Sequence, residues 1–213
     1  MGQNIIIYID GFNFYYGLKT NGWRNFLWLN IPSLFKLFLS DNQNLVLVKY
    51  FTARPLDPEK RAKQKKLFDV NLDIGSFEPI YGKYIKKKTT CHTCKRNLVC
   101  QGCGETFKNW EEKRTDVNIA VHLIGDIIEQ KCDHSIIVSA DSDLIPPIDY
   151  ITKQFPNHKL SVFFPPNRHS NDIAGIVKNT LSLVKYRSRF EKSILPNTFK
   201  LSSGIEIIKP DGW

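Results

Sequence analysis

Short apolar runs alternate with amphipathic stretches along most of the chain, and this alternation is typical of an α/β fold. The apolar runs have the length of buried strands, and residues with helical spacing separate them. The expected strands cover residues 4–9, 45–52, 77–81, 136–138, 160–164 and 181–184, with a further short strand at 205–208. The expected helices cover residues 14–18, 31–39, 57–74, 116–128, 144–154 and 173–177. This order predicts a mainly parallel sheet that helices cover.

Two of the apolar runs end in carboxylates. Residues 136–138 lead into Asp141 and Asp143, and residues 4–9 lead directly into Asp10. Because parallel strands bring their carboxyl ends to one edge of a sheet, we expect these acids to meet there. A helix N-cap needs only one Asp or Ser, so two acids in one turn favour a metal or catalytic role over simple capping.

A third carboxylate stands at the start of the expected helix 116–128. Thr115 is expected to cap this helix, which places Asp116 in its first turn. Asp116 could merely complement the helix dipole, an effect worth about 0.3–1 kcal/mol. The other interpretation is that Asp116 joins the acids at the sheet edge.

Composition adds a positive balance to this picture. The 213 residues include 30 Lys and Arg against 21 Asp and Glu, a net charge of +9, and 42% of them are hydrophobic. This length suits one globular domain with a small insertion, and the charge favours a polyanionic partner. No apolar run approaches the roughly 18 residues that span a bilayer. With no export signal at Met1, we expect a cytoplasmic protein and no membrane association.

Residues 83–110 interrupt the alternation of strands and helices with two cysteine pairs. Cys91-x-x-Cys94 and Cys100-x-x-Cys103 fit tetrahedral zinc, because each pair supplies two thiolates from one tight turn. Two disulfides are the alternative, but they conflict with a reducing compartment. We therefore expect a structural Zn²⁺ site that takes no part in catalysis.

Basic residues flank the cysteine pairs, with aromatic residues among them. Lys86, Lys87 and Lys88 form the densest cluster, and we expect them to hold nucleic acid while neighbouring aromatic rings stack on bases. Further contacts to nucleic acid are expected from Arg54, Lys113 and Arg168. Arg54 has the alternative of pairing with a carboxylate of the acidic site.

Three short motifs occur in this order along the chain: Asp10-Gly-Phe-Asn13, Lys113-x-x-Asp116-Val and Ser139-Ala-Asp141-Ser-Asp143. They resemble the motifs of the NYN domain family, PIN-like nucleases of the bacterial LabA-like kind, over roughly residues 5–184. The resemblance implies a PIN-like Rossmannoid three-layer α/β fold with a central, mainly parallel sheet. It also implies an acidic site that binds Mg²⁺ or Mn²⁺, and a divalent-metal-dependent endoribonuclease that hydrolyses phosphodiester bonds of RNA.

The residues that match the family's pattern are four acids, which would hold the metal, and one amide. They are Asp10, Asp116, Asp141, Asp143 and, as the polar companion, Asn13. Asp10 and Asp141 are the expected direct ligands, and Lys113 would offset phosphate charge. The sequence departs from the pattern in one place, because the family often carries a further Asp in its last helix and residues 177–180 hold no acid here.

The expected organisation is a nuclease domain over residues 1–185, a zinc-binding module at 83–110 inserted within it, and a C-terminal tail at 186–213. The alternatives are a non-catalytic RNA-binding regulator and a DNA nuclease with the same site. A third is a small-molecule hydroxylase, because some chains similar to this family are labelled hydroxylases of pyridine compounds. That activity needs a redox cofactor, and the sequence has no nucleotide-binding glycine fingerprint. The oligomeric state is left open, with a homodimer among the alternatives.

Overall fold

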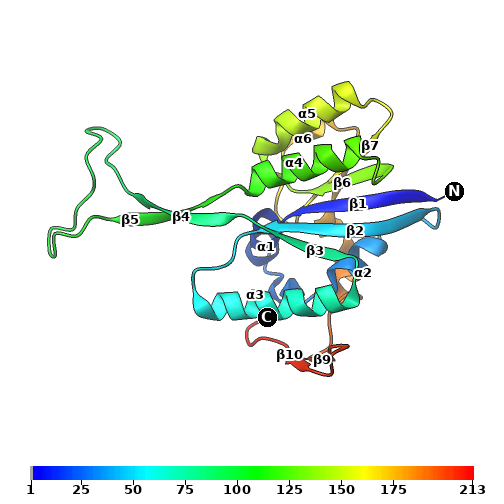
Figure 1. The fold of residues 1–213 in the computed structure, drawn as a ribbon, viewed down its shortest axis with the longest axis horizontal. Coiled ribbons are helices and arrows are strands. Elements are labelled where there is room, and N and C mark those ends of the chain that lie inside the picture. Colours follow the sequence, from blue (N-terminus) through cyan, green and yellow to red (C-terminus); the bar gives the residue numbers. More distant parts are fainter. Residues whose placement is uncertain (1) are drawn as a thin grey trace.

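One six-stranded parallel sheet organises the computed structural model, which describes residues 2–213 (Figure 1). The strands lie in the order β3-β2-β1-β6-β7-β8. They are β1 (Gln3–Asp10), β2 (Gln43–Thr52), β3 (Phe77–Tyr81), β6 (His134–Val138), β7 (Lys159–Phe164) and β8 (Asn179–Ser182). The chain moves outward in one direction from β1 to β3 and in the other from β6 to β8. The switch point of the topology, where α/β sheets bind ligands, therefore lies between β1 and β6.

Helices cover both faces of this sheet, which confirms the predicted α/β fold (Figure 1). One face packs against α1 (Gly11–Thr20), α2 (Ile31–Lys36) and α3 (Pro58–Ile74). The other face packs against α4 (Thr115–Ile128), α5 (Ile145–Gln154) and α6 (Asn171–Ile176). Strand β1 serves both cores, because Ile7 and Ile9 point to the first layer while Ile6 and Tyr8 point to the second. No helix within residues 2–213 has the length and apolar character needed to cross a membrane.

A hairpin leaves the sheet between β3 and α4 and projects from the body of the molecule (Figure 1). Its strands are β4 (Lys83–Lys88) and β5 (Lys108–Lys113), which pair antiparallel along their whole length. Residues 89–107 form the tip and carry both cysteine pairs. The interruption predicted at 83–110 is therefore a two-stranded stalk with a cysteine-bearing tip.

The C-terminal segment packs against the first core. It contains η3 (Leu183–Tyr186), α7 (Arg187–Glu191), and a small antiparallel pair of β9 (Thr198–Lys200) and β10 (Glu206–Ile208). Phe190, Leu195 and Ile207 are buried among residues of α1 to α3. Residues 186–213, expected as a tail, thus complete the core on one side of the sheet.

The structure corrects three local expectations. The helix expected at 31–39 ends at Lys36, and Phe38 packs on the core from a turn instead. The strand expected at 181–184 is β8, whose bounds shift because Leu183 is buried from a short 3₁₀-helix. Thr115 does not cap α4, because its hydroxyl donates to Glu112. The cap residue is Arg114, in a left-handed conformation with φ of 84°.

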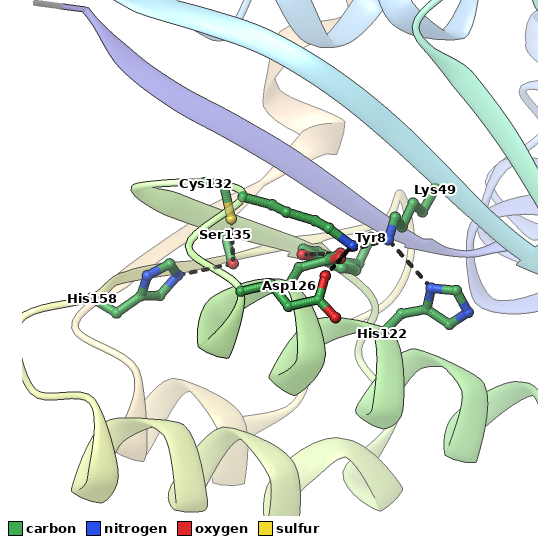
Figure 2. A network of polar contacts seen from close by, with 9 residues as sticks. Tyr8, Lys49, His122, Asp126, Cys132, Ser135 and His158 are labelled. Atoms are coloured by element: carbon green, nitrogen blue, oxygen red, sulfur yellow. Dashed lines mark hydrogen bonds and ion pairs between the residues drawn. The ribbon is translucent and has the colours of Figure 1, made fainter.

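A buried ion pair fixes α4 to the sheet (Figure 2). Lys49 Nζ on β2 donates to Asp126 Oδ2 at 2.6 Å, and the Tyr8 hydroxyl donates to the same oxygen at 2.9 Å. Burial would raise the pKa of Asp126, but the hydrogen bonds from Lys49 and Tyr8 hold it below its ordinary value. Helix α4, which carries Asp116 in its first turn, is therefore held at a fixed position over β1 and β2.

Candidate active site

Asp10 ends β1 and is only 4% exposed. Its Oδ1 accepts a hydrogen bond from the backbone N–H of Asn13 at 3.0 Å and so caps α1, while its Oδ2 accepts one from the Ser139 hydroxyl at 2.9 Å. The next residue is Gly11, where a Cβ would lie 2.6 Å from the carbonyl oxygen of Phe51. This close approach to β2 leaves no room for a side chain and holds Asp10 at the switch point of the sheet.

The loop that follows β6 brings Asp141 to the same place. The Asn13 side-chain oxygen accepts from the backbone N–H of Ala140 at 3.1 Å, which ties this loop to the end of β1. Ser139 Oγ accepts from the Asp141 N–H at 3.0 Å. Asp141 Oδ1 in turn accepts from the Asp143 N–H at 3.0 Å and caps η2 (Ser142–Leu144). The Asn13 side chain therefore links the ends of β1 and β6. The contact of Asn13 with the Asp10 carboxylate comes from its backbone N–H and not from its side chain.

Asp10, Asp116 and Asp141 converge from three separate elements. One carboxylate oxygen of each lies within 4.8 Å of the other two. Within residues 2–213 no other set of three or more His, Cys, Asp or Glu ligand atoms is as compact. Asp143 is not part of this trio, and its carboxylate is exposed, yet its charge acts on Asp116.

Negative charge accumulates in this acidic trio. Burial and the charges of Asp116 and Asp141 raise the pKa of Asp10 to about 6, although the hydrogen bonds to Asp10 lower it. Burial also raises the pKa of Asp116, and the charges of Asp141 and Glu112 add to the effect. A bound cation would relieve this repulsion. Because all the donors are carboxylate oxygens, the trio fits a hard ion such as Mg²⁺ or Mn²⁺.

Two further residues belong to the site although they were absent from the sequence prediction. Ser139 bridges Asp10 and Asp141 through its hydroxyl. The sequence indicates this residue only by its place at the start of the Ser-x-Asp-x-Asp motif. Glu112 lies at the end of β5, accepts from Thr115 and contributes to the raised pKa of Asp116. Glu112 was hidden in a charged stretch that has no hydrophobic pattern. It adds an acid to the site in a chain whose residues 177–180 hold none.

The basic residues expected near the acidic edge take different positions. The Arg54 guanidinium lies over the Tyr81 ring, 4.7 Å from its centroid. In the described part of the chain Arg54 makes no ion pair with a carboxylate. Lys113 pairs with Glu111 at 3.1 Å. Arg168 is exposed in the loop after β7, where its Cγ approaches α1 at Gly17.

The lysine cluster of the hairpin lies along β4. Lys86 Nζ stands 5.5 Å from the centroid of the Trp110 ring on β5, and Lys87 pairs with Glu111 at 3.3 Å. Lys88 is exposed at the end of the stalk. The cluster thus lies on an exposed ribbon whose base is next to Asp116.

The two cysteine pairs form turns with the same backbone hydrogen bonds. The Cys91 N–H donates to Arg96 O at 2.8 Å, and the Lys95 N–H donates to Cys91 O at 3.0 Å. The second turn repeats both bonds, from Cys100 N–H to Glu105 O at 2.8 Å and from Gly104 N–H to Cys100 O at 2.9 Å. The residue that follows each cysteine pair donates the second of these bonds and has a left-handed backbone conformation. Its φ is 58° at Lys95 and 74° at Gly104.

All four thiols of these turns are free. Backbone N–H groups inside each turn lower the pKa of Cys91 and of Cys100, which favours thiolates. Among the described residues, no three ligand atoms of the tip lie within 4.8 Å of one another. The zinc site expected from Cys91, Cys94, Cys100 and Cys103 therefore stays a prediction.

Comparisons with known proteins agree with this arrangement. The NYN domain family matches residues 4–171. A curated relative, 6-hydroxy-3-succinoylpyridine 3-monooxygenase HspA of Pseudomonas putida, is 29% identical over 177 residues, which cover 68% of this chain and 54% of the relative. The chain thus spans about half the length of that relative.

A solved structure shares the fold. It is a protein of unknown function from Vibrio parahaemolyticus, with a TM-score of 0.52 and 20% sequence identity. The likeness covers 85% of this chain and 93% of the other. The family match runs from β1 to the start of α6 and includes all three members of the acidic trio. The chain therefore belongs to the NYN domain family.

Proposed function

We propose that this protein is a divalent-metal-dependent endoribonuclease. The observation that carries the proposal is the convergence of Asp10, Asp116 and Asp141 at the switch point of the sheet. The chain belongs to the NYN domain family, which is a family of PIN-like nucleases. The net charge of +9 supports a polyanionic substrate, because Lys and Arg must balance the phosphates that the acids alone would repel.

Each residue of the site has a role in this proposal. Asp10 and Asp141 are direct ligands of Mg²⁺ or Mn²⁺, Asp116 completes the trio, and Asp143 orients water at the exposed side or helps to hold a second ion. When bound, the ion activates water and stabilises charge on the scissile phosphate. Ser139 holds the Asp10 carboxylate in place through the hydrogen bond to Oδ2, and Asn13 keeps the two strand ends together.

Basic side chains hold the substrate around the acidic trio. Arg54 and Arg168 are exposed near the ends of β2 and β7, where their guanidinium groups can pair with phosphates in a fork geometry. Lys113 lies at the base of the hairpin and shares its charge between Glu111 and the substrate. Along the stalk, Lys86, Lys87 and Lys88 extend the contact to nucleotides further from the cleavage point.

We also propose that one Zn²⁺ joins the two cysteine turns at the tip of the hairpin. Their matching hydrogen bonds present the thiol pairs as two halves of a tetrahedral Cys₄ site, which has no open position for chemistry. Metal binding would supply the ordering energy that a short polar tip lacks. The ion is structural, and it sets the shape of the basic hairpin.

The decisive experiment compares two aspartates of similar chemistry. Removing a group that only orients a metal ligand typically costs about 10–100-fold in activity. Asp141→Asn removes a proposed ligand itself, so it should lower the rate of Mn²⁺-dependent cleavage of single-stranded RNA by more than about 100-fold. Asp149→Asn is the control, because Asp149 is a carboxylate on α5 that pairs with Lys153, at 2.6 Å, and with no other side chain among residues 2–213. It should cleave like wild type. Cleavage by Asp141→Asn at the wild-type rate, with both variants folded by circular dichroism, would remove the proposal.

The same assay separates the nucleic-acid alternatives. RNA and DNA of one sequence, supplied in competition, decide between an endoribonuclease and a DNA nuclease. An RNA-binding regulator would retain RNA in a filter-binding assay and show no turnover with either Mg²⁺ or Mn²⁺.

One observation favours a second candidate function, which is the similarity to HspA. A ring hydroxylase inserts one oxygen atom of O₂ into its substrate and reduces the other to water with two electrons from a donor. Oxygen consumption by this protein with 6-hydroxy-3-succinoylpyridine and NADH would identify that activity. The nuclease proposal expects none.

A further inference from the structure

A cavity of about 320 Å³ opens at the edge of the sheet where β1 and β2 end. It lies between α1, α3, the connection from β2 to α3, and the base of the hairpin. Gly11, which directly follows Asp10, lines this cavity, and so does Thr52 at the end of β2. The cavity therefore reaches the ends of β1 and β2, at the edge of the sheet where the acidic trio lies.

Aromatic rings line this cavity. Phe12 and Tyr84 meet edge to face with ring centroids 6.3 Å apart, so that the hairpin base closes one side. Tyr15 and Tyr16 form a second edge-to-face pair, with centroids 5.2 Å apart. Tyr16 is 45% exposed, and an accessible ring of this kind can stack on a flat heterocycle.

Lysines stand at the same cavity. Lys63 is already paired with Glu59, at 2.8 Å. Lys60 and Lys19 also line the cavity, and neither has a carboxylate within 4.0 Å among residues 2–213. The carboxylate that lines the cavity, Asp57, caps α3 by accepting from the Lys60 N–H at 2.9 Å.

From these contacts we infer that the cavity is a nucleoside subsite, which holds the base of a nucleotide next to the scissile phosphodiester. The base stacks on Tyr16, and the neighbouring phosphate pairs with Lys60. A base must leave its helix to enter such a cavity, so the substrate is single-stranded or looped RNA. The inference rests on the proposed function and adds the substrate class to it.

A nucleotide fits this cavity better than a small ring acid does. The cavity and the acidic trio lie at the same edge of the sheet, so one nucleic-acid chain can place a base in the cavity and a phosphate at the carboxylates. The two unpaired lysines also suit a ligand with several phosphates along a chain. A pyridine acid would use one lysine and leave the trio without a partner.

The test measures binding without cleavage. RNA hexamers that carry a single abasic nucleotide at successive positions are titrated against the full chain with Asp141→Asn, by fluorescence anisotropy. One abasic position should weaken binding by about 10-fold, since stacking of one base is commonly worth that much. In the double variant with Asp141→Asn and Tyr16→Ala, the same abasic position should cause no further loss of affinity.

Matched variants control for general damage. Tyr150→Ala removes a ring on α5 that is 47% exposed and lies outside the cavity, so it should keep the position-dependent loss. Lys60→Ala should weaken binding of hexamers, whereas Lys65→Ala on the same helix, which lies outside the cavity, should not.

Each outcome decides between named alternatives. Equal affinity for every abasic hexamer, or equal effects of Tyr16→Ala and Tyr150→Ala, would overturn the subsite. The subsite would also be overturned if the protein bound 6-hydroxy-3-succinoylpyridine and Tyr16→Ala abolished that binding while RNA binding stayed unchanged.

The subsite and the nuclease proposal can fail separately. If one abasic position weakens binding and wild-type protein cleaves nothing, the nuclease proposal fails and the subsite stands. If cleavage depends on the metal and all abasic hexamers bind equally, the nuclease proposal stands and the subsite fails.

Discussion

Asp10 is a carboxylate that the fold holds in a position unfavourable for its charge. Burial and two neighbouring acids raise its pKa from 3.8 to about 6. A carboxyl group whose pKa is raised in the folded state favours folding while it is protonated. This contribution is fully present below about pH 4 and is lost as the pH rises through about 6. The metal-free protein therefore carries a cost at neutral pH that a cation can remove.

Metal binding should accordingly stabilise the protein in a pH-dependent way. Mn²⁺ must displace the proton of Asp10, so the rise in Tm on adding Mn²⁺ should be large at pH 7.5 and small at pH 5. Thermal unfolding with and without Mn²⁺ at both pH values measures the effect. Asp10→Asn should abolish the difference, and Asp149→Asn should preserve it. An equal rise in Tm at pH 5 and pH 7.5 would show that Asp10 is not a ligand.

The acids of the site could be predicted because buried strands that end in Asp leave a clear pattern in the sequence. Asp10 and Asp141 were found in this way, and Asp116 through the start of its helix. The roles of Ser139 and Glu112 depend on which oxygen each side chain meets, and that is decided only when β1, β5 and β6 come together. A sequence pattern carries no such information.

Among the elements, the strands of the hairpin were the hardest to predict. Most residues of β4 and β5 are exposed on both faces, so their sequence lacks the alternation of apolar and polar positions that identifies a strand. The cysteine pairs gave a clearer signal than the strands that carry them. Their turns depend on backbone hydrogen bonds that the Cys-x-x-Cys spacing already implies.

The hairpin tip should contain metal. Purified protein should hold about one Zn²⁺ per chain, because two Cys-x-x-Cys turns complete one tetrahedral shell. Cys91→Ala and Cys100→Ala should each release it, and elemental analysis after dialysis measures the loss. Cys132→Ala is the control, since this thiol is buried between α4 and β6. Protein free of zinc, with all four thiols of the tip reactive toward a thiol reagent, would contradict the assignment.

At the level of the whole molecule, the C-terminal segment is part of the first core. Phe190 is fully buried, and its ring centroid lies 5.2 Å from that of Trp23 and 5.6 Å from that of Phe26. Phe190→Ala should lower the free energy of unfolding by about 3–5 kcal/mol, the usual cost of a large buried cavity. Urea denaturation measures this, and Phe107→Ala at the exposed hairpin tip should change little. A loss below about 1 kcal/mol for Phe190→Ala would mean that the segment packs loosely.

The arrangement of the whole sheet could be predicted only in part. Buried strands that alternate with amphipathic helices indicate a parallel sheet, and this was confirmed. The order of the strands and the docking of residues 186–213 depend on contacts between distant segments, which local patterns do not encode. The acids after residues 4–9 and 136–138 predicted only that these two strands end at the same edge of the sheet, and not that β1 and β6 are neighbours.

The hairpin enters and leaves the body of the molecule at one point, because Lys83 and Lys113 face each other where its strands begin. An insertion with adjacent ends can grow, shrink or disappear during evolution while every strand of the sheet stays in register. Relatives that keep the same catalytic centre are thus free to acquire arms of different reach. If the proposed nuclease activity holds, such divergence would alter which RNA is captured and leave the chemistry intact.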